Sequence, residues 1–66
     1  MKAFYCILDA EDREVNFYAK EFPDALRGAI SSASKVRGSC VVEKKVSDNG
    51  EVSESVVWEN PRKIED

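Results

Sequence analysis

The sequence predicts a small α+β domain in which a four-stranded antiparallel sheet carries one helix on one face. Two segments with strand character come first, at Ala3–Leu8 and Glu14–Lys20. A helical apolar stripe follows from Phe22 to Gly38, and the last third has a strong hairpin signal between two valine-rich runs. The order strand, strand, helix, strand, strand is typical of a two-layer domain, because one helix covers only one face of a sheet.

The two N-terminal segments predict a hairpin. Every position from Ala3 to Leu8 is apolar, which indicates a strand covered on both faces and therefore central in the sheet. Val15, Phe17 and Ala19 alternate with polar residues, which is typical of a half-exposed edge strand. The polar loop Asp9–Arg13 is short enough to join the two strands in antiparallel fashion.

The helix is predicted from its start signal and its apolar spacing. Phe22-Pro23-Asp24 favours a helix start, because proline is tolerated in the first turn and aspartate favours the positive end of the helix dipole. Gly38 is placed to end the helix in a left-handed conformation. Gly28 weakens the helix by about 1 kcal/mol relative to alanine, so we expect packing on the sheet to hold it. The predicted stripe consists of Leu26, Ala29, Ile30, Ala33 and Val36.

Side-chain pairing decides the register of the last hairpin. A three-residue loop Asp48-Asn49-Gly50, with Gly50 at positive φ, pairs apolar residues with apolar residues, whereas a two-residue turn pairs them with polar ones. The predicted pairs are Val46 with Val52, Lys44 with Glu54, Val42 with Val56 and Cys40 with Trp58. We expect the apolar members to face the helix, and Lys44 and Glu54 to form a cross-strand ion pair on that side.

The simplest unknotted sheet with a central first strand has the order 2-1-3-4, all antiparallel, although other orders remain open. Residues 1-59 then form a single domain. Residues 60-66 show no periodicity, so we predict a flexible C-terminal tail from Asn60.

Composition excludes several classes of function. The 66 residues carry 13 acidic and 10 basic side chains, a net charge of -3, and no histidine. Mechanisms that need an imidazole as base or metal ligand are therefore excluded. No apolar stretch approaches the roughly 18 residues of a membrane span, and Met1 does not begin an export signal, so we expect a soluble cytoplasmic protein.

The groups that could carry chemistry all have simpler interpretations. Cys6 and Cys40 lie in apolar runs, are too few for a zinc site, and are expected to be buried free thiols. The loop carboxylates Asp9, Glu11 and Asp12 lack the glycine and terminal glutamate of a calcium loop, so we expect them to be solvated. No glycine-rich phosphate loop is present. We predict a protein that is not an enzyme and uses no metal or cofactor.

One alternative is a nucleic-acid-binding domain. Arg27, Lys35 and Arg37 cluster on the predicted helix, and Tyr5 and Tyr18 are able to stack bases from an open sheet face. The net charge of -3 argues against this function, because the acidic side chains repel phosphates.

The favoured function is protein binding. With Phe4, Cys6 and Leu8 facing the helix, an apolar patch is left on the opposite, open face of the sheet, and contiguous exposed apolar patches mark interfaces. The predicted partner-binding residues are Tyr5, Ile7, Val41, Val57 and Tyr18. The patch serves either a larger partner protein, with or without the Asp9–Arg13 loop, or a second copy of the chain in a homodimer.

In layout, the whole chain resembles the small accessory proteins of bacteriophages, which include short acidic chains of this element order without catalytic residues. Some of those proteins bind and block host defence or regulatory machinery. The resemblance implies a non-enzymatic inhibitor of a larger host protein, and it transfers no functional residue, because no motif carries it.

Overall fold

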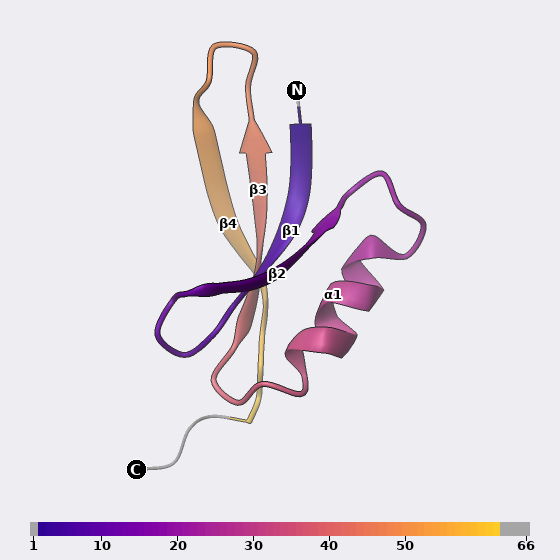
Figure 1. The fold of residues 1–66 in the computed structure, drawn as a ribbon, viewed down its shortest axis with the longest axis vertical. Coiled ribbons are helices and arrows are strands. Elements are labelled where there is room, and N and C mark those ends of the chain that lie inside the picture. Colours follow the sequence, from indigo (N-terminus) through magenta and orange to yellow (C-terminus); the bar gives the residue numbers. More distant parts are fainter. Residues whose placement is uncertain (1, 63–66) are drawn as a thin grey trace.

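The computed structural model describes residues 2–62, in which four strands form one antiparallel sheet of order β2-β1-β3-β4 (Figure 1). The elements are β1 (Lys2–Leu8), β2 (Glu14–Ala19), α1 (Ala25–Ala33), β3 (Cys40–Val46) and β4 (Val52–Glu59). The predicted α+β class and strand order are therefore confirmed. β1 is central, and its Cys6 and Ile7 are fully buried, as its apolar composition requires.

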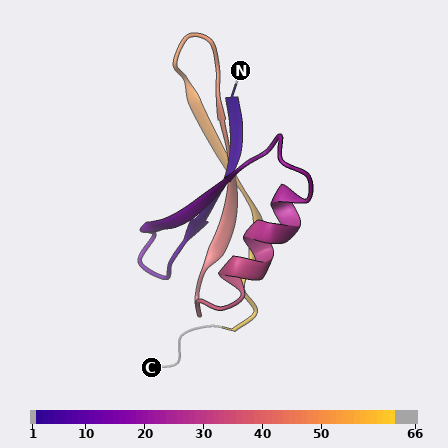
Figure 2. The same cartoon turned by 45° about the vertical axis from the view of Figure 1, so that its right-hand side comes forward.

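The helix covers the face of the sheet opposite to the predicted one (Figure 2). Its partners in the core are Tyr5 and Ile7 of β1 and Val41 of β3, whereas Phe4 and Cys6 alternate with them and face away. The side chains that the helix buries are those of Ala25, Ala29 and Ala33. Alanine side chains are short, so they allow the helix to pack closely against the larger side chains of Tyr5, Ile7 and Val41. The predicted orientation is wrong because a strand that is apolar on both faces does not indicate which one the helix covers.

The β3–β4 loop has the predicted form. The Ser47 backbone N–H donates to the Glu51 carbonyl over 2.9 Å, and the Gly50 N–H donates to the Ser47 carbonyl over 3.0 Å. Gly50 has a φ of 87°, a conformation that glycine adopts without a side-chain clash. The predicted pairs Val46 with Val52, Lys44 with Glu54 and Val42 with Val56 all occur.

A β-bulge at Val57 makes the predicted pairing of Cys40 with Trp58 wrong. Below the bulge, Trp58 pairs with Val41, and Cys40 pairs with Glu59. Because one extra residue reverses the side to which the following residues point, Trp58 packs against the helix-side core, as predicted. The valines that pair above the bulge point to the other face, contrary to the prediction; they are Val42, Val46, Val52 and Val56.

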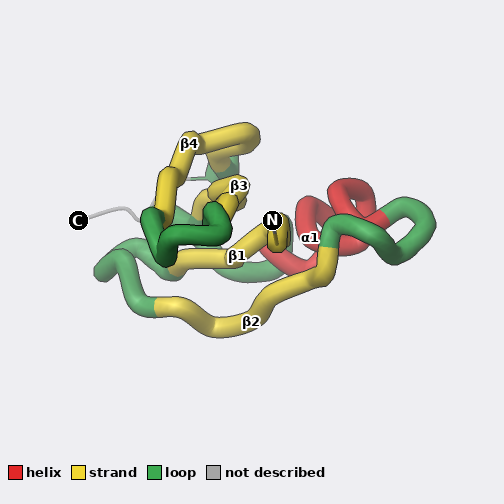
Figure 3. The backbone as a smooth tube through the Cα atoms, turned by 90° about the horizontal axis from the view of Figure 1, so that it is seen from above, coloured by secondary structure: helices red, strands yellow, loops and turns green. Residues whose placement is uncertain are grey.

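The helix is shorter than predicted. It begins after Asp24, which has a φ of 57° and makes no side-chain capping bond, and it ends at Ala33, well before Gly38. Leu26, predicted in the buried stripe, is 37% exposed. Gly28 lies in a close approach: a Cβ there would lie 3.3 Å from Cε2 of the Tyr18 ring, so a larger residue would have to displace that ring slightly. The first part of β4 extends past the helix (Figure 1), which packs against β1, β2 and β3. Seen from above, the helix lies to one side of the strands (Figure 3).

Asn60 anchors the chain after β4, so the predicted flexible tail does not begin there. Its buried side-chain amide donates to the carbonyls of Ala33 and Val36 over 3.0 and 2.8 Å. These bonds satisfy carbonyls at and just beyond the end of the helix. Gly38, predicted as the helix cap, instead donates its N–H to the Arg62 carbonyl over 2.8 Å. The remainder of the predicted tail, residues 63–66, lies outside the described residues.

Candidate protein-interaction surface

Most of the predicted partner-binding residues lie in the core. Tyr5, Ile7 and Val41 are buried beneath the helix, and only Val57, at the bulge, is clearly exposed, at 42%. Tyr18 is partly buried, with its hydroxyl 2.6 Å from Oγ of Ser32 in the helix. The interface predicted from these residues is therefore wrong, because the helix occupies the face on which four of them lie.

The face without the helix carries a different set of apolar residues. We call it the uncovered face, and its apolar residues include Phe4, Cys6, Phe17, Val42, Val46, Val52 and Val56. Phe17 is 59% exposed and Val56 is 56% exposed. The Phe4 and Phe17 rings meet edge to face with centroids 6.1 Å apart. Cys6 and Val42 are buried at its centre, so the exposed apolar side chains lie on the outer strands β2 and β4.

Charged side chains on the uncovered face include those of Lys2, Glu14, Lys44 and Glu54. Lys44 Nζ lies 3.8 Å from Glu14 Oε2, so the ion pair of Lys44 reaches across β1 to β2. The predicted ion pair with Glu54 does not form, although Lys44 and Glu54 are cross-strand neighbours. The Cys6 thiol donates to the same Glu14 oxygen over 3.5 Å.

Both cysteines are free, as predicted, and Cys6 is fully buried whereas Cys40 is half-buried. Burial first, and then the charge of Glu14, raise the pKa of the Cys6 thiol to about 11. Burial likewise raises the pKa of Cys40. A thiol with a raised pKa stays protonated at neutral pH and is a poor nucleophile, so Cys6 acts here as a small apolar residue that also donates a hydrogen bond.

On the helix side of the sheet, Glu43 forms ion pairs with two lysines. Lys20 Nζ lies 2.6 Å from Glu43 Oε2, and Lys45 Nζ lies 3.4 Å from Glu43 Oε1. The hydrogen bond from Lys20 is the main reason that the pKa of Glu43 is lowered. The two lysines of β3 thus turn to Glu14 and Glu43, and neither pairs with a carboxylate of β4.

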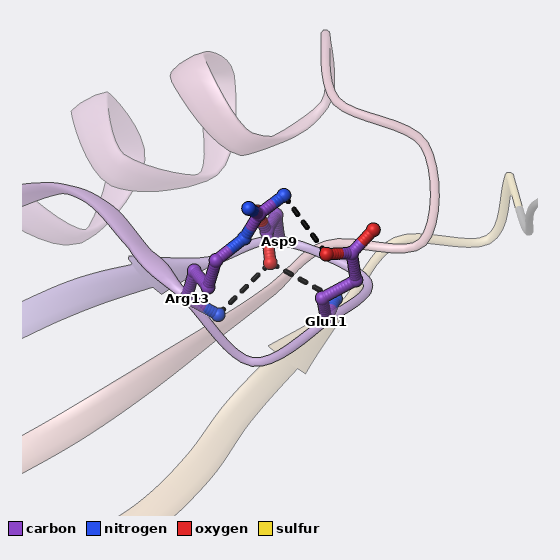
Figure 4. Close-up of polar contacts among 3 residues, drawn as sticks. All are labelled: Asp9, Glu11 and Arg13. Carbon is purple, nitrogen blue, oxygen red and sulfur yellow. Dashed lines mark hydrogen bonds and ion pairs between the residues drawn. The ribbon is translucent and has the colours of Figure 1, made fainter.

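In the acidic β1–β2 loop, the carboxylates of Asp9 and Glu11 bind groups of the loop itself (Figure 4). Asp9 Oδ1 accepts the backbone N–H groups of Glu11 and Arg13, each over 2.9 Å. The Arg13 guanidinium pairs with Asp9 over 3.2 Å and with Glu11 over 2.9 Å. These bonds, first the one from the Arg13 N–H, lower the pKa of Asp9. The carboxylates of Asp9 and Glu11 therefore stabilise the conformation of the loop.

The basic residues proposed for nucleic acid are more dispersed than predicted. Arg27 lies in α1, whereas Lys35 and Arg37 follow the end of the helix. All three are exposed. Tyr5 and Tyr18, predicted to stack bases, lie beneath the helix instead.

Within residues 2–62, no group of three or more Cys, Asp or Glu side chains is arranged to hold a metal ion. Over the same residues, the helix is too short and too polar to cross a membrane. No protein-family model, curated protein or solved structure matches the chain.

The exposure of Phe17 and Val56, and the position of Phe4 beside Phe17 on the uncovered face, were not predicted from the sequence. A signal was present in the helix, where alanines recur every four residues at positions 25, 29 and 33 and Gly28 lies beside them. Such a small-residue surface fits against large side chains. The face with two tyrosines was therefore the better candidate to lie under the helix.

Proposed function

We propose that this chain is a non-enzymatic protein-binding module that occupies the surface of a larger protein with its uncovered face. The observation that carries the proposal is the exposure of Phe17 and Val56, both more than half exposed, on the face that lacks a helix. Contiguous apolar side chains on a small monomer are typical of an interface. Phe4 extends the same surface from the central strand.

The charges on this face favour a protein over a nucleic acid or an anionic membrane. Glu14 and Glu54 lie among the apolar residues, and Lys44 is paired with Glu14. The chain as a whole has a net charge of -3. Carboxylates at the contact surface repel phosphate groups, whereas a surface that combines apolar side chains with a few charged ones is common in protein interfaces. The resemblance in layout to bacteriophage accessory proteins stays a prediction.

The experiment is affinity capture from the native cells with a matched pair of variants. Phe17→Asp places a charge on the uncovered face, and Phe22→Asp makes the same change at a residue of similar exposure, 63%, in the loop before the helix. We expect Phe17→Asp to reduce capture of the partner by at least about tenfold, since a buried unpaired charge at an interface is costly. Phe22→Asp should capture as the parent does.

Circular dichroism of both variants separates loss of binding from loss of folding. Equal capture by a folded Phe17→Asp variant and the parent contradicts the proposal. Recovery of nucleic acid, lost when Arg27 and Arg37 are replaced, contradicts it as well and favours the alternative site.

A further inference from the structure

The two edges of the sheet differ in how their outward-facing backbone groups are protected. In β2, the Phe17 backbone N–H donates to the Asn16 side-chain oxygen over 2.8 Å, so the strand satisfies that donor itself. A bulge at Val15 interrupts β2 further along. A bulge is a known way to prevent another strand from pairing with an edge, and a donor that is already bonded is not available to such a strand. The bulge of β4 lies only at Val57, after the segment considered next.

The edge of β4 is open over its first five residues. Ser47 and Glu51 are joined by a backbone hydrogen bond, and bonded and non-bonded pairs alternate along an antiparallel ladder. Ser53 and Ser55 therefore bond to β3. The N–H and C=O groups of Val52, Glu54 and Val56 point away from the sheet, and the side chains of these residues lie on the uncovered face.

The open edge is also acidic. Between Lys45 and Arg62 the chain has no basic residue, and its four carboxylates are those of Asp48, Glu51, Glu54 and Glu59. The lysines of β3 are turned toward Glu14 and Glu43. Glu54 forms no ion pair within the described residues. A strand added to this edge would therefore lie beside Val52, Glu54 and Val56, which present an apolar, an acidic and an apolar side chain in turn on the uncovered face.

We propose that β4 accepts an extended segment of the partner protein as a fifth strand, with apolar side chains opposite Val52 and Val56 and a basic side chain opposite Glu54. This inference rests on the proposed function and names the class of partner. Backbone bonds to an edge strand give affinity, and alternate side chains give specificity. Between two copies of the chain, the β4 edges bring together the same carboxylates, so charge favours a basic segment over a second copy.

The test is a titration of ¹⁵N-labelled protein with a blocked peptide, acetyl-Ser-Val-Ser-Lys-Ser-Val-Ser-amide. Its pattern reads the same in both directions, so it presents valine, lysine and valine to the edge in either strand orientation. We expect the amide signals of Val52, Glu54 and Val56 to shift and to exchange more slowly with solvent. The matched peptide with glutamate in place of lysine should bind about fivefold more weakly, as expected for reversing one cross-strand charge pair.

Two variants isolate the edge from the rest of the fold. Glu54→Pro removes an outward N–H that β3 does not use, so the domain should fold and lose the peptide. Ala19→Pro, its control, makes the same change on β2 and should keep the peptide. If Glu54→Pro does not fold, Glu54→Lys should reverse the preference between the two peptides, and Glu21→Lys, with the same charge change in the loop after β2, should not.

Shifts confined to β2, no shift at millimolar peptide, or β4 shifts that follow protein concentration alone would overturn the inference; the last would indicate pairing of two copies. The proposed function fails separately. If capture still depends on Phe17 while the peptide does not bind β4, the uncovered face binds a partner in another way. If capture is independent of Phe17 while the peptide binds β4, the edge acts without the face.

Discussion

The central strand β1 and the edge strand β4 both carry large apolar side chains, but their surroundings are opposite. In β1, Tyr5, Cys6 and Ile7 are consecutive buried residues, enclosed by β2, β3 and the helix. In β4, every residue from Val52 to Val57 is exposed: Val52, Glu54 and Val56 lie on the uncovered face, and the helix does not extend over the other side of this segment. The comparison teaches that burial here depends both on the position of one short helix and on flanking strands, since Cys6 and Val42 are buried in the middle strands on the face without the helix. The apolar side chains of Val52, Val56 and Val57 stay exposed.

The largest expected effect comes from shortening a side chain in each region. Ile7→Ala should cost about 2 to 5 kcal/mol of the free energy of unfolding, because Ile7 is fully buried and a cavity remains. Val56→Ala should change it by no more than about 0.5 kcal/mol, since the valine is exposed. Urea denaturation of both variants measures the difference. Similar losses in the two would mean that β4 is covered in solution and would break the comparison.

A second, smaller effect concerns the anchor that joins the end of β4 to the covered region. Asn60→Ala removes donors to the Ala33 and Val36 carbonyls. Leaving buried carbonyls without partners costs about 1 to 3 kcal/mol, so we expect the midpoint of urea denaturation to fall accordingly. Asn60→Asp is the matched control for size, because it keeps the shape but cannot donate when ionised. An unchanged midpoint in Asn60→Ala would show that the chain is free after Glu59.

The smallest effect is a pH dependence of the β1–β2 loop. The pKa of Asp9 is lowered from its ordinary value of 3.8 by the Arg13 and Glu11 N–H groups and by the Arg13 side chain. The folded state therefore favours the ionised form, and the resulting stability is present above the unfolded pKa and is lost as pH falls through the lower folded value. Asp9→Asn should lose stability less steeply than the parent below about pH 4. Identical pH profiles of the two unfolding transitions would contradict this account of the loop.

Much of the fold was predictable from short-range signals. The central position of β1 follows from its continuous apolar run, and the β3–β4 register follows from like-with-like pairs around Gly50. The choice of the covered face was not predictable from periodicity, because both faces of β1 are apolar. The bulge at Val57 gives no sequence signal of its own, yet it decides that Trp58 and Val56 point to opposite sides.

The wrong choice of the covered face also made the predicted interface residues wrong. Tyr5, Ile7 and Val41 were predicted as an interface because they were assigned to the wrong face, while Phe4 and Val56 were assigned to the helix side. One helix still covers only one face of the sheet, so an apolar face is left uncovered whichever face the helix packs on. The identity of that face depends on tertiary packing, namely the fit of small helix residues against the tyrosines.

The central claim is that the uncovered face and the β4 edge contact the partner while the helix side holds the fold. The most direct test is the footprint of the captured partner on isotope-labelled protein, measured by cross-saturation and amide exchange in the complex. We predict that the contacts fall on Phe17, Val52 and Val56, with Arg27, Lys35 and Arg37 unaffected. A footprint on Arg27, Lys35 and Arg37, with β4 unchanged, would contradict the account.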